Sequence, residues 1–195
     1  MTGDRWQQPQ RASLADDKRP ASILDLRDHA YWALPDRLLA GEYPGSRQDD
    51  QAREKLRAFL AAGVTFFLDL TEPQEHGLRP YARLLEYEAA TMGVRVTHCR
   101  KSIPDNQVPT RDQMVQILAT LDEALAAGKT AYVHCYGGIG RTGTVVGCFL
   151  VERGMSGMDA LSEVGRLHAA TPDGDRPSPE TPAQQDMVLN WAAVR

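Results

Sequence analysis

Residues 130–143 read TAYVHCYGGIGRTG, and this stretch tells more about the fold than any other. Its first five residues are β-prone and mostly apolar, which predicts a buried strand. Three glycines follow, Gly137, Gly138 and Gly140, and they allow the backbone to curl until successive N–H groups point inward. A helix is expected over about 141–152, with partial positive charge at its N-terminus. The stretch therefore predicts a strand, an anion-binding loop and a helix.

The rest of the chain alternates short apolar runs with segments of helical periodicity. Thr110 and Gln113 have the spacing of a capping box, which starts a helix. The alternation predicts an α/β fold with a central, mostly parallel β-sheet flanked by helices on both faces, in three layers. The expected strands are 37–40, 64–68, 94–97 and 130–134, and the expected helices are about 52–60, one opening at Pro80, 110–127, 141–152, 157–169 and 181–194.

The length of 195 residues is enough for one domain with a sizeable core. We expect a flexible N-terminal tail over 1–21 and a single domain over 22–195. The net charge of −4 provides no basic field for nucleic acid, and no apolar run is long enough for a membrane anchor. Cys99, Cys135 and Cys148 suggest neither a disulfide framework nor a zinc site, which indicates a reducing, cytoplasmic setting. The composition does not indicate an oligomeric state.

Cys135 stands at the start of the glycine-rich curl, where several features favour negative charge. Inward N–H groups, the helix dipole and the planar fork of Arg141 converge there. We therefore expect a thiolate nucleophile at Cys135 and a phosphate clamp at Arg141. The plainer alternative is a small buried cysteine at a strand end, with glycines that only form a turn. The expected phosphate-binding residues are Tyr136, Gly137, Gly138, Ile139, Gly140 and Arg141.

The motif His-Cys-x5-Arg-Thr-Gly at 134–143 resembles the signature loop of the cysteine-dependent protein tyrosine and dual-specificity phosphatases. The resemblance covers roughly residues 38–191, and 38–45 are similar to the opening of compact, bacterial-type members. It implies a two-step reaction, in which Cys135 attacks phosphorus to form a phosphocysteine and water then hydrolyses that intermediate. It implies no metal and no cofactor, because Arg141 and the loop backbone supply the charge stabilisation.

The resemblance also implies partners for the cysteine. Asp105 lies in the Pro-bracketed segment 102–109 and resembles the family's general acid, although an aspartate beside proline is often a turn former. The hydroxyl of Thr142 is expected to donate to the sulfur, to satisfy backbone groups at the helix start, or both. Gln184 resembles the glutamine that positions the hydrolytic water, with a solvent-facing side chain as the equal alternative.

Two other residues have weaker signals. His134 precedes the cysteine as in the family, and we expect it to brace the loop by hydrogen bonds rather than to carry a proton in the reaction. Cys99 is expected to be a small buried residue, with a redox partnership with Cys135 as the alternative.

The function expected from this pattern is hydrolysis of phosphate monoesters on proteins or peptides, with phosphotyrosine favoured and dual specificity open. An inositol phosphate or phosphoinositide phosphatase shares the loop, but Tyr136 and Ile139 are uncharged where members acting on such polyanions tend to carry lysine. A rhodanese-type sulfur transferase would need neither Asp105 nor the Arg-Thr-Gly continuation. A phosphate-binding pseudophosphatase usually lacks the nucleophile, arginine or acid.

Overall fold

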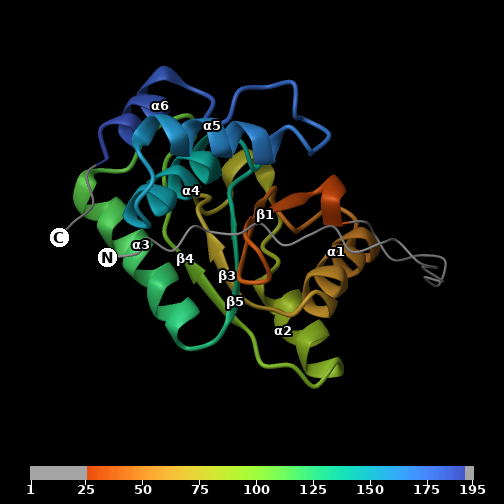
Figure 1. The fold of residues 1–195 in the computed structure, drawn as a ribbon. Coiled ribbons are helices and arrows are strands. Elements are labelled where there is room, and N and C mark those ends of the chain that lie inside the picture. The colour runs from red at the N-terminus through yellow and green to blue at the C-terminus, as the bar shows by residue number, and fades with distance from the viewer. Residues whose placement is uncertain (1–25, 192–195) are drawn as a thin grey trace, which may run out of the picture.

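A five-stranded sheet with strand order β1-β2-β5-β3-β4 forms the centre of the computed structural model, which describes residues 26–191 (Figure 1). β1 and β2 pair antiparallel, and the other pairs are parallel. The expectation of a mostly parallel sheet is confirmed. The strands are β1 (Ala30–Leu34), β2 (Leu38–Gly41), β3 (Val64–Asp69), β4 (Thr97–Arg100) and β5 (Thr130–His134).

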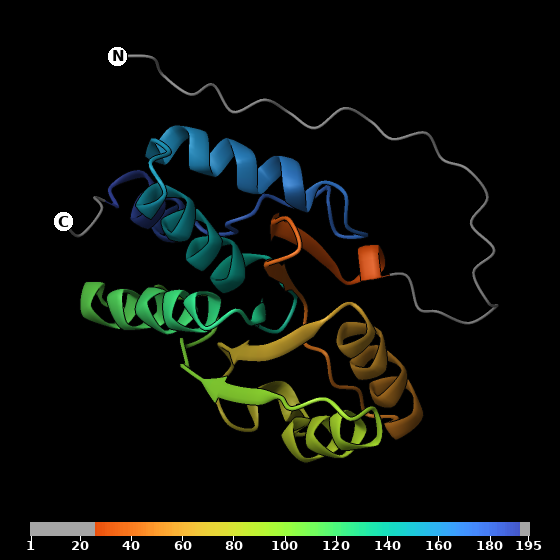
Figure 2. The same cartoon turned by 60° about the horizontal axis from the view of Figure 1, so that its bottom comes forward.

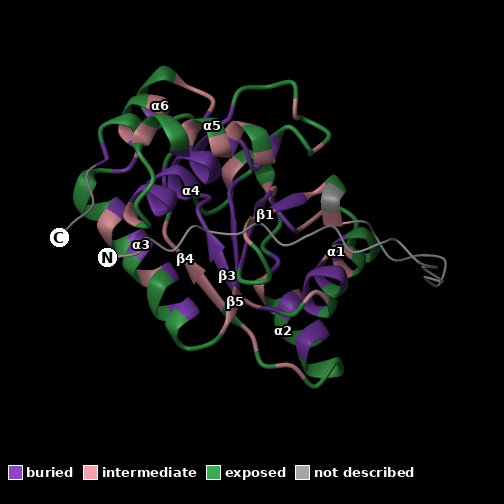
Figure 3. Cartoon of the chain, in the orientation of Figure 1, coloured by how far each residue is buried: buried purple, intermediate pink, exposed green. Residues whose placement is uncertain are grey.

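Helices cover both faces of the sheet, as expected (Figure 2). One face packs against α1 (Asp49–Ala61) and α2 (Ala82–Thr91). There the ring of Tyr132 on β5 stacks on that of Phe59, with the ring centroids 4.2 Å apart. The other face packs against four helices, of which α4 is buried along nearly its whole length (Figure 3). The remaining elements are α3 (Arg111–Ala126), α4 (Gly140–Glu152), α5 (Gly157–His168), α6 (Pro182–Leu189) and the short 3₁₀ helices η1 (Leu26–Asp28) and η2 (Glu75–Gly77).

Two strand predictions were wrong. The expectation misses β1, and the strand predicted over 94–97 lies at Thr97–Arg100. Val94 instead closes α2, because its N–H donates to the Ala89 carbonyl at 2.9 Å. β4 is an edge strand of intermediate exposure, so its sequence THCR is polar and lacks the apolar signal of a central strand.

Capping boxes start α3 and α6, whereas the helix predicted to open at Pro80 begins at Ala82 without a side-chain cap. Thr110 and Gln113 form the predicted capping box, and Thr181 forms a second one with Gln184. The last helix ends at Leu189, well before the predicted residue 194; residues 192–195 lie outside the described part, as does the predicted tail over 1–21. No helix within 26–191 has the length and apolar character needed to cross a membrane.

Candidate active site

The tight curl of the loop between β5 and α4 requires a glycine at position 138. Gly138 has a φ of +75°, and a Cβ there would lie 2.4 Å from the carbonyl carbon of Gly41. Of the three glycines expected to allow the curl, Gly138 has a positive φ, whereas Gly137 and Gly140 do not. A Cβ at Gly140 would lie 2.8 Å from Oε1 of Gln184, so the side-chain amide of Gln184 would have to shift to accommodate it.

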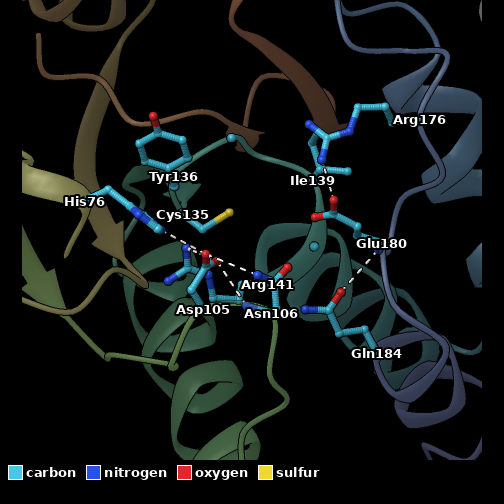
Figure 4. Close-up of a pocket in the computed structure, with 12 residues that line it drawn as sticks. His76, Asp105, Asn106, Cys135, Tyr136, Ile139, Arg141, Arg176, Glu180 and Gln184 are labelled. Atoms are coloured by element: carbon cyan, nitrogen blue, oxygen red, sulfur yellow. Dashed lines mark hydrogen bonds and ion pairs between the residues drawn. The ribbon is translucent and has the colours of Figure 1, made fainter.

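A pocket of about 260 Å³ opens over this loop (Figure 4). Cys135 is buried at 3% exposure and still lines the pocket, whereas Tyr136 at its rim is 50% exposed. The pocket brings together four of the five predicted catalytic residues, and Thr142 is not among its lining. The lining residues are His76, Asp105, Asn106, Cys135, Tyr136, Gly137, Ile139, Gly140, Arg141, Arg176, Glu180 and Gln184.

Arg141 is held by a residue that the sequence did not indicate. Its Nη1 and Nη2 donate to the two carboxylate oxygens of Glu75 at 2.7 and 2.6 Å, and Nη1 also donates to the Ile103 carbonyl at 3.0 Å. Both side chains of the pair are buried, at 2% and 5% exposure. A buried bidentate pair fixes the guanidinium plane, which is what a phosphate clamp requires.

The turn carrying Glu75 has an unusual backbone. Gln74 and His76 have φ values of 63° and 48°, in the left-handed region that residues other than glycine seldom adopt. This turn directs Glu75 to Arg141 and places Nε2 of His76 2.9 Å from Oδ2 of Asp105. Neither residue has a sequence signal, because the segment 71–77 reads as an ordinary polar loop.

Asp105 lies at the pocket, on the loop between β4 and α3, as predicted. Partial burial would raise the pKa of this carboxyl, but the hydrogen bond with His76 and the charge of Arg141 outweigh it and lower the pKa below the usual value. The Arg141 guanidinium is 2.9 Å from Oδ1. The carboxyl is therefore ionised at neutral pH in this structure, whereas a general acid must be protonated when it acts.

Thr142 and Gln184 have clear neighbours. The hydroxyl of Thr142 lies 3.5 Å from the Gly41 carbonyl, at the outer limit for a hydrogen bond, and within the described chain it makes none to the sulfur. Gln184 is buried, so the solvent-facing alternative is wrong. Its Oε1 accepts from the N–H of Thr181 at 3.1 Å, and its Nε2 donates to the Gln107 carbonyl at 3.2 Å. Its amide therefore links the loop that carries Asp105 to the start of α6 beside the pocket.

His134 lies beneath the loop with both ring nitrogens bonded. Nδ1 is 3.2 Å from the carbonyl oxygen of Cys135, and Nε2 is 2.6 Å from the hydroxyl of Tyr81. A carbonyl only accepts, so Nδ1 carries the proton and the Tyr81 hydroxyl donates to Nε2. Burial lowers the pKa of His134 to about 4, and the ring is neutral at physiological pH. These contacts are those of a residue that braces the loop.

The sheet register separates Cys99 from the nucleophile. Cys99 lies opposite Leu68 on β3, and Leu68 lies opposite Val133 on β5. Two strand spacings put Cys99 about 10 Å from Val133, with Cys135 two residues further along the chain. A disulfide requires Cα atoms within about 7 Å, so a direct bond between Cys99 and Cys135 would need backbone movement. All three cysteines are free thiols.

A pocket that is lined by the buried Cys135 and by an arginine fixed in an ion pair fits the expected signature of the cysteine-dependent phosphatases of the tyrosine and dual-specificity class. Comparison with protein families gives the same class. The model of the family described as "Polymorphic toxin system, DSP-PTPase phosphatase" matches residues 43–155, and the chain belongs to this family.

Relatives among curated proteins are longer than this chain. A protein of invertebrate iridescent virus 3 that is named as a tyrosine phosphatase (067L) is 27% identical over 174 residues, which cover 84% of this chain and 65% of the viral protein. The Arabidopsis thaliana "Phosphatidylinositol 3,4,5-trisphosphate 3-phosphatase and protein-tyrosine-phosphatase PTEN1" is 27% identical over 183 residues, 92% of this chain and 42% of the plant protein. The chain thus spans less than two thirds of the length of these relatives.

Solved structures share the fold. The active form of Tk-PTP is 29% identical, with a TM-score of 0.61 over 82% of this chain and 92% of that one. The human tyrosine phosphatase-like serine/threonine/tyrosine-interacting protein superposes with a TM-score of 0.62 over 84% and 95% of the two chains. Its identity is only 17%, so it supports the fold alone.

Proposed function

We propose that this chain hydrolyses phosphate monoesters on proteins, with phosphotyrosine as the better substrate, through a phosphocysteine intermediate. The observation that carries the proposal is the meeting of Cys135, Arg141 and Asp105 in one pocket, although Asp105 comes from a different loop than the other two. A pocket of about 260 Å³ accommodates a phosphate and part of its aryl group. The three free cysteines are compatible with a reducing, cytoplasmic setting.

In the first step the Cys135 thiolate attacks phosphorus while the bond from phosphorus to the leaving oxygen breaks. Asp105, protonated in the substrate complex, gives its proton to that oxygen. Arg141 and the loop N–H groups hold the charge on the other phosphate oxygens. The binding of a phosphate dianion beside Asp105 raises its pKa, because like charge disfavours ionisation and because Arg141 is then shared with the phosphate.

In the second step water attacks the phosphocysteine. Asp105, now a carboxylate, takes a proton from the water, the bond between sulfur and phosphorus breaks, and inorganic phosphate leaves with Cys135 again a thiolate. The burial of Gln184 at the pocket wall supports a role in positioning this water. The hydroxyl of Thr142 is assigned to stabilising the departing thiolate, which requires it to turn from the Gly41 carbonyl.

The preference for phosphotyrosine is supported by an aromatic rim. The ring centroids of His76 and Tyr136 lie 5.0 Å apart at the pocket, with the ring planes tilted by 54°, and the two rings offer aromatic contacts to a phenyl group. The phosphoinositide alternative draws support from the Arabidopsis relative, which is named as a phosphatidylinositol 3,4,5-trisphosphate 3-phosphatase. Against it, the pocket lining balances Arg141 and Arg176 with Asp105 and Glu180, which leaves no excess positive charge for several phosphates.

The test uses the purified full chain and the Cys135→Ser variant. We expect turnover of phosphotyrosyl peptides in the presence of a metal chelator, inhibition by vanadate, and no turnover by Cys135→Ser with binding of the phosphate analogue retained. Turnover by the serine variant would overturn the mechanism. A higher kcat/KM for soluble inositol phosphates than for phosphopeptides would overturn the protein substrate and leave the chemistry standing.

A further inference from the structure

Two further cavities adjoin the Cys135 pocket through shared lining residues. A cavity of about 400 Å³ shares His76, Tyr136 and Arg176 with that pocket. A further cavity of about 460 Å³ shares Ser46 and Arg79 with the cavity of about 400 Å³. We call these two cavities the flanking groove. The groove runs from the aromatic rim past the loop after β2 and ends beside α2.

The charge of the flanking groove is opposite to that of the whole chain. Six cationic side chains and three carboxylates line it, a net charge of three positive, whereas the chain carries −4. Glu88 and Glu180, which pair with two of these cations from outside the groove lining, reduce this excess to one positive charge, so the field that attracts anionic ligands depends on the cations without partners. The cations are Arg47, Lys55, Arg176, Arg53, Arg79 and Arg83, and the carboxylates are Glu42, Asp49 and Asp173.

Most of these cations already have carboxylate partners. Lys55 pairs with Glu42, Arg53 with Glu88, Arg79 with Asp49 at 3.1 Å, and Arg176 with Glu180.

Two arginines differ from the rest. The guanidinium groups of Arg47 and Arg83 are exposed and make no ion pair or side-chain hydrogen bond within residues 26–191. Each presents a planar fork that suits a carboxylate. The groove can therefore hold a chain segment, and along it lie two arginines that are free to bind carboxylates.

We infer that the flanking groove binds the peptide segment beside the phosphorylated residue and selects segments with acidic side chains. The inference rests on the proposed protein substrate. A phosphotyrosine inserted toward Cys135 passes the rim of His76 and Tyr136, which line both the pocket and the groove. The neighbouring peptide residues then lie at the start of the groove, within the field of Arg47.

An inositol polyphosphate fits this arrangement less well. Its phosphates surround one small ring and would all lie near the pocket, where Asp105 and Glu180 oppose them. Arg83, in contrast, lines only the part of the groove beyond Arg79, so the unused cations follow a path rather than encircle the cysteine. An elongated anionic ligand, an acidic peptide, matches that path.

The experiment compares two phosphotyrosyl peptides. One has Asp and Glu beside the phosphotyrosine, and the other has Asn and Gln at the same positions. It measures kcat/KM for the full chain, for Arg47→Gln, for Arg83→Gln and for the double variant. Arg95→Gln is the matched control, because Arg95 is exposed and lines neither the pocket nor the groove. A small aryl phosphate, which does not reach the groove, reports the basal activity of each variant.

We expect the wild type to prefer the acidic peptide, by about two- to fivefold for each arginine engaged, and the preference to weaken as salt is raised. The double variant should lose the preference, while Arg95→Gln keeps it and aryl phosphate turnover stays unchanged in all variants. Equal turnover of both peptides by the wild type, or an unchanged preference in the double variant, would overturn the inference alone. Hydrolysis of aryl phosphate or inositol polyphosphate without hydrolysis of either peptide would overturn the protein substrate and the inference with it.

Discussion

Oδ1 of Asp105 lies 2.9 Å from Nη2 of Arg141, so the proposed acid and the phosphate clamp form an ion pair with each other. The pair has consequences for both groups. Together with the hydrogen bond to His76, it lowers the pKa of Asp105 below the usual value, and it requires a phosphate held by Arg141 to compete with a carboxylate.

The first prediction concerns pH. Because the pKa of Asp105 is lowered in the free enzyme, the protonated acid becomes scarce as pH rises, and kcat/KM for a phenolic leaving group should decline along a basic limb. His76→Asn removes the hydrogen bond that lowers this pKa and tolerates the left-handed φ of 48°. The pKa of Asp105 then rises, so the basic limb should move to higher pH. The measurement is a pH series of kcat/KM, and an unmoved limb would show that His76 does not tune the acid.

The second prediction concerns the proton itself. In Asp105→Asn the donor is lost, while the nucleophile and the cradle remain. The loss of kcat/KM should be about 10²- to 10⁴-fold for a basic phenolic leaving group and should shrink for activated aryl phosphates that depart without help. Wild type and variant are compared over a series of aryl phosphates. A uniform loss across the series, or none, would mean that Asp105 is only a turn residue.

The third prediction concerns the buried pair of Arg141 and Glu75. Glu75→Gln removes the charge that the buried guanidinium faces, and the free energy of unfolding should fall by about 1.5–3 kcal/mol. The same change should lower kcat/KM, because the clamp loses one of its two bidentate oxygens. Urea unfolding and steady-state kinetics measure the two effects. Glu72→Gln, on the exposed part of the same loop, is the control and should change neither; equal behaviour of the two variants would contradict this role.

The fourth prediction concerns the second step. Gln184→Ala should slow hydrolysis of the phosphocysteine more than its formation, so that a rapid burst of product precedes a slower steady state and KM falls together with kcat. Gln185→Ala is the matched control, since Gln185 bonds to the Pro179 carbonyl and does not line the pocket. Rapid-quench kinetics tests this. An absent burst with a lower folding stability would assign Gln184 to the capping box alone.

Local features of the fold were predictable because neighbours in sequence create them. The strand, loop and helix at 130–143, the capping box of Thr110 and Gln113, and the layered α/β architecture all follow from short-range patterns. The polar edge strand β4 was displaced in the prediction because its pairing with β3, and not its own composition, makes it a strand.

The sequence by itself determined the proximity of the proposed nucleophile and the proposed clamp, since Cys135 and Arg141 are six residues apart and one turn of loop and helix places both at the same pocket. Only the tertiary structure decided what surrounds them. Glu75 is 66 residues from Arg141 and His76 is 29 residues from Asp105, and each contact depends on where β3 and β4 lie beside β5. Ion pairs between distant segments leave no local pattern, because a carboxylate in a polar loop has the same sequence signature whether it faces solvent or a buried guanidinium.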